Sequence, residues 1–581
     1  MSTSVVEAHD ASVKPKSEAR QSSDSPSASI PLSPITLVPS TSPSSSSLPA
    51  PTTAHSDNST SNQESRLEPK LDYPTGFALW LVIAALVSSI FLISLDMTIV
   101  ATAIPSITDE FGGLQDQSWY GSVFYMTAGG FQSTWGKTYK YFPLKLSYLT
   151  AIFIFEVGSL ICGVAPNSVA FIIGRAIAGV GAAGVGCGSY SIITFIAEPK
   201  NRASYTGLLG AIFGIGSVLG PLLGGVFSST ISWRWCFYIN LPVGVIPVGI
   251  VVFFFHAPDT AKPQEAGFRE KVLQMDPLGT TLMMGLIISY LTAVNYGGQT
   301  HPWSSSIVIG LLVGVGLITI AFILCEWWQD DRAIIVPRLF KRREIGLSAL
   351  YSIIQAGGFF SMIYYLPIYF QAIRGSSPII SGVQNLPFIL AAMAGALGAG
   401  VFISNTGLST VLMIVGAAIG VLGCGLCYTF DIDTPIGKWI GYEIIAGFGL
   451  GGALQIPVIV GQVSVGSADL SSATAIMLCF QTLGGAFWVA ASQAVLVNTL
   501  LLALPHTAPG VDPSLVLATG AGQLRHVFTK EELPGILAAY LQGIRATFIL
   551  STTVVGGAFL LAFFLPWKKL DLNAVRNAGA A

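Results

Sequence analysis

Apolar residues follow one another along most of this chain in runs of about 20, and short polar stretches between the runs carry the charges. One such run spans a bilayer as an α-helix, because lipid offers backbone N–H and C=O groups no other partner. The pattern predicts fourteen spanning helices, near 77–104, 118–136, 145–165, 170–197, 203–228, 236–256, 277–296, 305–327, 345–373, 379–403, 409–430, 438–462, 472–502 and 546–566. We therefore expect an all-α polytopic membrane protein.

Composition agrees with that prediction. The 581 residues are 52% hydrophobic and only 10% charged, whereas about a quarter of a soluble domain is charged. A net charge of −2 indicates no nucleic-acid partner. Residues 1–76 are mostly rich in Ser, Pro and Thr and contain no apolar signal-peptide core, so we expect a disordered tail.

A repeat divides the chain. RAIAGVGAAG at 175–184 returns as EIIAGFGLGG at 443–452, and LGGVF at 223–227 returns as LGGAF at 483–487. Two related halves, each with an ionisable residue at the same point of a spanning segment, are typical of secondary transporters. We expect a six-helix bundle, a linker with two extra helices, a second six-helix bundle and a tail, at 77–256, 257–343, 344–566 and 567–581.

Lysine and arginine indicate the orientation. If the N-terminus is cytoplasmic, the predicted cytoplasmic loops and tails hold most of these residues. The outside keeps only Arg234, Arg374, Lys438, Arg525, Lys530 and Arg545, the last at the end of a long loop predicted at about 503–545. Short cytoplasmic loops collect basic residues, so we expect both termini to be cytoplasmic.

Four ionisable residues remain at membrane depth: Asp96, Glu156, Arg175 and Glu443. Each costs about 2.5–3.5 kcal/mol at the bilayer centre, so we expect them to face the protein interior. Asp96 is the main candidate for proton coupling, because alternate hydration and burial would swing its proton affinity. The alternative is a structural ion pair with Arg175. Glu443 is either a second coupling group or a neutral, hydrogen-bonded acid, and for Glu156 we favour a structural role.

Several motifs imitate other chemistry. GVGAAG (179–184) and GFGLGG (447–452) fit the dinucleotide pattern GxGxxG, but both lie inside apolar helices, where glycine serves close helix packing. Gly136-Lys137-Thr138 lacks the first glycine of a phosphate loop, so we expect no ATP motor. Cys424 and Cys427 have no second pair or nearby histidine. We expect buried thiols, no metal, no cofactor and no catalytic cluster, hence no enzyme.

Segment 5 contains GSVLGPLLGG, with Gly216, Gly220, Pro221, Gly224 and Gly225. Proline inside a helix removes a hydrogen bond and kinks it, and glycines thin the helix face. We expect a closely packed, bendable hinge. Ordinary small-residue packing is the alternative, although it would not need the proline.

Residues 77–566 resemble the fourteen-helix drug:proton antiporters of the major facilitator superfamily. The motifs that carry the resemblance are LDMTIVATAIP (95–105), FIIGRAIAGVGAAG (171–184), GSVLGPLLGG (216–225) and SWRWCFYINLPVG (232–244). The resemblance is strongest to fungal efflux pumps for toxins and secondary metabolites. It implies the major facilitator fold with fourteen helices, and it assigns the coupling aspartate and arginine to Asp96 and Arg175.

One departure concerns the loop after segment 2. The family pattern there is G-x-x-x-D-[RK]-x-G-[RK], and its aspartate helps to hold the cytoplasmic gate. This chain keeps Gly136, but Lys140 stands at the aspartate, Pro143 at the glycine and Leu144 at the basic position. The sequence therefore leaves open how that gate is held.

By this resemblance we expect a monomeric, proton-coupled exporter of a hydrophobic or amphipathic small molecule in the plasma membrane. Segments 1, 4, 9 and 12 should line a central cavity, with Gln355, Tyr364, Tyr365 and Gln455 as candidate lining residues. Uptake of a siderophore or amino acid, or a vacuolar role, is the alternative. A third possibility is a membrane sensor or enzyme. The sequence does not support it, because it contains no recognisable catalytic cluster and no segment expected to fold as a soluble domain.

Overall fold

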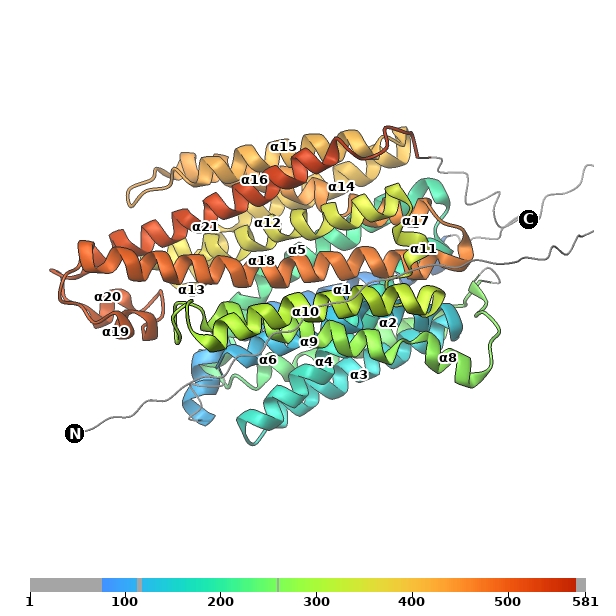
Figure 1. Ribbon diagram of the computed structural model, residues 1–581, viewed down its shortest axis with the longest axis horizontal. Helices are drawn as coiled ribbons and strands as arrows, with labels where there is room; N and C mark the ends of the chain where they lie inside the picture. Colours follow the sequence, from blue (N-terminus) through green and yellow to red (C-terminus); the bar gives the residue numbers. More distant parts are fainter. Residues whose placement is uncertain (1–75, 112–116, 259–260, 571–581) are drawn as a thin grey trace, which may run out of the picture. The chain divides into compact units, whose positions relative to one another are not determined.

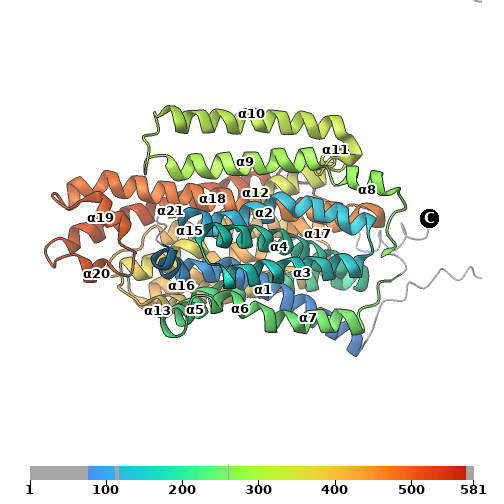
Figure 2. The ribbon, with the colours of Figure 1, turned by 90° about the horizontal axis from the view of Figure 1, so that it is seen from below.

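The computed structural model describes residues 76–111, 117–258 and 261–570, and these are almost entirely α-helical (Figure 1). The predicted tails lie outside the described residues up to residue 75 and from residue 571 onward. The long helices run side by side along one direction in both views (Figures 1 and 2). An all-α membrane architecture is therefore confirmed.

The first helices form what we call the N-terminal group. They are α1 (Phe77–Phe111), α2 (Gln117–Tyr141), α3 (Leu144–Val164), α4 (Ser168–Ile196), α5 (Pro199–Thr230), α6 (Trp235–Tyr238) and α7 (Asn240–Phe254). Local signals set their starts: Pro143 precedes α3, and the Asn167 side chain accepts a hydrogen bond from the Ala170 N–H at the start of α4. The predicted sixth segment is divided into α6 and α7.

The linker contains α8 (Phe268–Gln274), α9 (Pro277–Tyr296), α10 (Ser306–Gln329), η3 (Asp330–Arg332) and α11 (Pro337–Phe340). The two long helices, α9 and α10, pack against each other, and α9 also contacts α2 and α18. Figure 2 shows α10 as the outermost of the pair. Most of its apolar side chains are exposed, as expected of a helix that faces lipid.

The remaining helices form the C-terminal group. They are α12 (Arg343–Ala372), α13 (Pro378–Gln384), α14 (Leu386–Thr406), α15 (Ser409–Cys427), α16 (Ile436–Leu454), α17 (Ile456–Val463), η4 (Ser467–Asp469), α18 (Leu470–Thr507), α19 (Pro513–Ala518), α20 (Leu524–Val527) and α21 (Leu533–Ala562). Predicted segment 12 is interrupted between α16 and α17 at Gln455, just before Pro457, which cannot donate a backbone hydrogen bond.

Thirteen helices in the described ranges are long and apolar enough to cross a membrane. The remaining predicted span, α2, is 25 residues, or about 37 Å, long but is more polar than the others. The prediction for the last span was wrong at its start, because α21 begins at Leu533 rather than near 546. Arg545 therefore lies inside α21, where its Nε donates to the Phe430 carbonyl at 2.9 Å.

Helix packing follows the order of the sequence repeat. In the N-terminal group α1 packs on α5 and α7, and α4 packs on α2 and α3. In the C-terminal group α12 packs on α18 and α21, and α16 packs on α14 and α15. Each of these long helices thus has a counterpart with the matching partners, as expected of a duplicated architecture.

Two seams join the groups: α2 against α18, and α5 against α14. Glycine lies in both. A Cβ added to Gly136 on α2 would collide with the Cβ of Ala475, and one added to Gly207 on α5 would lie 2.6 Å from the Ala396 carbonyl oxygen. At these points the helices of the two groups approach closely, because the glycine places no side chain between them.

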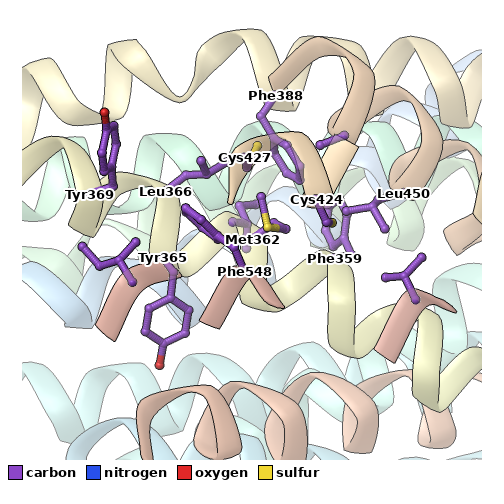
Figure 3. Packing of buried hydrophobic residues seen from close by; sticks show 14 of the residues in the cluster. Phe359, Met362, Tyr365, Leu366, Tyr369, Phe388, Cys424, Cys427, Leu450 and Phe548 are labelled. Atoms are coloured by element: carbon purple, nitrogen blue, oxygen red, sulfur yellow. The ribbon is translucent and has the colours of Figure 1, made fainter. Parts of the chain in front are cut away.

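Within the C-terminal group, α12 supplies the centre of the apolar core. Figure 3 shows Phe359, Met362 and Leu366 packed among residues of α14, α15, α16 and α21. Cys424 and Cys427 belong to this core, and all seven cysteines are buried and free. The interpretation of this pair as buried thiols is confirmed.

Two ends of the helix array are used below. The end where α2 stops and α3 starts carries Lys140, Lys200 and Arg338, and we call it the basic end. The opposite end, where α18 stops and α19 and α20 lie, we call the loop end (Figure 1).

Candidate substrate cavity and buried charges

The glycines of the predicted hinge hold α5 against α1. A Cβ on Gly216 would lie 2.7 Å from Ser94 Cβ, and Cβ atoms on Gly220 and Gly224 would collide with the hydroxyls of Thr98 and Thr102. The α1 hydroxyls bond to α5 in return; Thr102 donates to the Pro221 carbonyl at 3.3 Å.

The fourth glycine of the motif, Gly225, faces open space. Three of the four glycines thus serve close packing, which was the simpler of the two readings. That Pro221 lies inside α5 is a fact of the structure, whereas a bending role for it stays a prediction.

Asp96 lies on the same helix, α1, and pairs with Arg175 of α4. The Arg175 Nη1 to Asp96 Oδ2 distance is 2.5 Å, and neither side chain is exposed to solvent. The other Asp96 oxygen accepts a hydrogen bond from Asn240 Nδ2 at 3.0 Å, and Arg175 Nε donates to the Tyr120 carbonyl at 3.1 Å. The pair therefore ties α1 to α2, α4 and α7.

An aromatic ring covers the pair. The guanidinium carbon of Arg175 lies 4.3 Å from the centre of the Phe124 ring, a cation–π geometry. Arg175 Nη2 and both oxygens of nearby Glu156 have no hydrogen-bond partner among the described residues. A buried pair with spare donors can change partners if Asp96 takes up a proton, because the attraction that holds Arg175 would then fall.

Glu443 stands apart from this cluster. It is fully buried on α16 and lies close to the backbone N–H of Phe388, but neither oxygen accepts a hydrogen bond of good geometry. No cation pairs with it among the described residues. Arg175 is thus a partner of Asp96 and not of Glu443, a choice that the sequence left open.

A cavity of about 750 Å³ lies between the two groups. Its walls come from α1, α2, α4 and α5 on one side and from α9, α12, α16 and α18 on the other. Three of the four candidate lining residues, Tyr364, Tyr365 and Gln455, contribute to its walls. In Figure 3 the Tyr365 ring points away from the packed Met362 and Phe388 side chains. The volume falls in the range of about 300–1,000 Å³ that holds drug-sized ligands.

The prediction for Gln355 was wrong, because its side chain does not line the cavity. It is fully buried, and its Nε2 donates to the Leu450 carbonyl of α16 at 3.3 Å. The α12 helix is rotated so that Tyr364 and Tyr365 face the cavity while Gln355 braces α16. Asp96, Arg175 and Glu443 do not line the cavity either.

Several polar lining residues were missed by the sequence analysis. They lie on segments 2, 4 and 13 and include Tyr125, Tyr190, Gln132, Gln481 and Gln493. The hydroxyls of Tyr125 on α2 and Tyr364 on α12 meet across the cavity, so the two groups touch there. The sequence did contain a signal for these residues, because each is an amide or a phenol side chain within an otherwise apolar segment.

The cavity reaches the loop end and stops short of the basic end. Asn295, Gln299, Thr300 and Leu517 line it near the loop end. At the basic end, Lys140 Nζ on α2 lies 3.0 Å from Asp469 Oδ1, directly before α18. Arg338 joins the same carboxylate at 3.0 and 3.2 Å.

This contact answers the question raised by Lys140. The side chains of Lys140 and Asp469 are only 12% and 17% exposed, so most of this ion pair is shielded from solvent between the two groups. Where the family pattern has an aspartate on the α2 side, this chain has the cation there and the anion on the α18 side.

The family model described as Major Facilitator Superfamily matches residues 86–489. The chain is 48% identical to the protein named "Probable efflux pump gsfJ" of Penicillium aethiopicum, covering 87% of this chain and 91% of that protein. It is 40% identical to the "Dehydrocurvularin exporter" of Aspergillus terreus, covering 88% and 89%. This chain belongs to the Major Facilitator Superfamily.

Solved structures agree on the fold. The human organic anion transporter MFSD10 (TETRAN) superimposes with a TM-score of 0.53 over 83% of this chain and 99% of that one, at 14% sequence identity. At that identity the likeness concerns the fold alone. The protein is a multi-pass membrane protein of a transporter family, and the resemblance stated from the motifs is confirmed.

Proposed function

We propose that this protein is a proton-coupled exporter that moves a hydrophobic or amphipathic small molecule across the membrane by alternating access. The observation that carries the proposal is the 750 Å³ cavity between the two helix groups, which reaches one end of the array while an ion pair closes the other. The names of the related efflux pump and exporter support the direction of transport.

The proposal includes the orientation and the proton site. The basic end would be cytoplasmic, in line with the positive-inside rule, with both termini there and the protein acting as a monomer in the plasma membrane. Asp96 would take up a proton and release its hold on Arg175, and Glu443 would be a second candidate coupling group. Segments 77–256 and 344–566 would move as two bundles about the cavity, with 257–343 as the inserted linker.

The geometry supports indirect coupling. Asp96 and Arg175 lie outside the cavity, but Phe124 both lines the cavity and covers Arg175. A change in the pair therefore reaches the cavity wall through one ring. One proton moving inward supplies about 2.3 kcal/mol at 100 mV and about 1.4 kcal/mol per pH unit, enough for a cargo gradient of several hundredfold.

The test uses the purified full-length protein in liposomes with an acidic lumen that contains a pH-sensitive dye. Fractions of fungal metabolites are added outside, and vesicles with the basic end outward are compared between wild type and Asp96→Asn. Proton release that requires both a cargo and Asp96, with the Asp96→Asn protein shown to be folded and monodisperse before reconstitution, supports export. If the cargo is instead loaded into the lumen of the same vesicles, proton release that accompanies its loss from the lumen would indicate uptake by symport.

A further inference from the structure

We infer that the cavity takes an uncharged aromatic molecule that carries a hydroxyl group, and that the side-chain oxygen of Gln455 accepts the hydrogen bond from that hydroxyl. The inference rests on the proposed function and narrows its substrate class.

The charge of the ligand follows from the lining. Among the described residues that line the cavity there is no Asp, Glu, Lys, Arg or His side chain. A charged ligand would lose water on entry and find no opposite charge, which is unfavourable for an ion of either sign. The nearest buried charges, Asp96 and Arg175, already neutralise each other at 2.5 Å. An uncharged ligand has no such penalty.

The aromatic character follows from the walls. Rings of both groups face the cavity, including Tyr125 and Phe213 from the N-terminal group and Phe360, Tyr364 and Tyr365 from the C-terminal group. Phe213 and Phe360 already meet edge to face, with ring centres 5.8 Å apart. A flat ring can replace such contacts with stacking or edge contacts of its own.

The hydroxyl follows from an unpaired acceptor. Gln455 is 6% exposed, lines the cavity, and its Oε1 has no hydrogen-bond partner among the described residues. Buried amide oxygens ordinarily have one, so this oxygen is free for a donor from a ligand. The amide nitrogen of the same side chain is engaged, because it donates to the Tyr190 hydroxyl oxygen, so only the Gln455 Oε1 is left without a partner.

The backbone fixes the position of this acceptor. Gln455 occupies the interruption between α16 and α17, which Pro457 enforces. On the other side, Gly210 of α5 leaves room for the side chain; a Cβ there would lie 2.6 Å from Gln455 Cγ and 2.9 Å from its Nε2. Gln481 Nε2 donates to the carbonyl of Leu454, the residue before Gln455, at 3.3 Å. That carbonyl, at the end of α16, therefore has a partner, and the Gln455 side chain is not needed to supply one.

The experiment measures equilibrium binding to the full-length protein in lipid nanodiscs, with protein-free nanodiscs to subtract partition into lipid. The probes are matched sets built on pyrene and on naphthalene: the methanol derivative, its methyl ether, the methylammonium and the carboxylate. We expect the alcohols to bind at least 10-fold more tightly than either ion and about 5- to 10-fold more tightly than the ethers.

Two variants test the role of Gln455. Gln455→Leu should remove the preference for alcohol over ether while keeping the preference for uncharged probes. Gly210→Ala should have the same effect, because its added methyl group would displace the Gln455 side-chain amide. This variant replaces Gln455→Leu as the test if Gln455→Leu does not fold. Gly214→Ala is the matched control on α5, because an added Cβ there would lie 3.5 Å from its nearest neighbour, an ordinary contact.

Three results would overturn the inference: an ion binding as tightly as its alcohol, an alcohol-to-ether ratio unchanged in both variants, or no probe binding to folded wild type. These outcomes are independent of the transport assay. Proton-coupled export of a charged cargo would leave the proposed function standing and defeat this inference, whereas selective alcohol binding without proton coupling would do the reverse.

Discussion

Reversing the charge of Lys140 should open the basic end. In Lys140→Asp the carboxylate would face Asp469, whose oxygen now lies 3.0 Å from the Lys140 ammonium. Two like charges about 4 Å apart repel each other by about 4 kcal/mol at an effective dielectric constant near 20, before desolvation is taken into account. Arg338, which bonds to the same carboxylate, would offset part of the repulsion.

We therefore expect a net effect of about 1.5–2 kcal/mol against the state closed at the basic end, or a shift of about 10- to 30-fold in the ratio of the two conformations. Asp469→Lys should act similarly. The combined exchange, Lys140→Asp with Asp469→Lys, should restore much of the closed population, because the ion pair is rebuilt with its polarity reversed.

The assay is a distance distribution between spin labels at Lys200→Cys on α5 and Ser467→Cys before α18, both exposed at the basic end. All seven native cysteines are buried, so labelling at the two introduced thiols is selective. Two results would refute the conclusion that this ion pair holds the basic end closed. One is an unchanged distance distribution in Lys140→Asp, and the other is a double exchange whose effect equals the sum of the two single changes.

Three further predictions concern stability. Asp96→Asn should lower the free energy of unfolding by about 3–5 kcal/mol, because it leaves Arg175 buried without a counter-charge, and adding Arg175→Gln should recover part of the loss in a denaturant titration. Gly220→Val should abolish folded, monodisperse protein in size-exclusion chromatography, because the side chain would collide with α1, whereas Gly225→Val faces open space and should elute as wild type. Glu443→Gln should change the thermal midpoint by less than the equivalent of about 1 kcal/mol, since no described cation pairs with Glu443; a larger loss would indicate a charged partner.

The spans could be predicted because lipid imposes one simple requirement, a run of apolar residues long enough to cross it. The prediction was wrong where that requirement does not decide the helix. The start of α21 contains Gln542 and Arg545, so apolar character begins late although the helix begins at Leu533. The α2 helix is lined with polar groups because much of it faces other helices and the cavity rather than lipid.

The candidate site was predictable only in part, for a geometric reason. Family position placed Tyr364, Tyr365 and Gln455 on the right segments, but helix rotation decides which side chains face the cavity, and Gln355 faces α16 instead. The partner of Lys140 lies 329 residues away along the chain, and no local pattern links them. Such pairings come from the tertiary fold alone.

The glycine-lined seams have a consequence for the speed of conformational exchange. Along α2–α18 and α5–α14 the backbones touch almost directly, at Gly136 against Ala475 and at Gly400 against the Ala203 carbonyl. Where a glycine lies at the contact, it has no side-chain rotamer that must change when the two helices slide past each other. The ion pair of Lys140 and Asp469 has to break when the basic end opens, so the height of the activation barrier should depend on ionic strength.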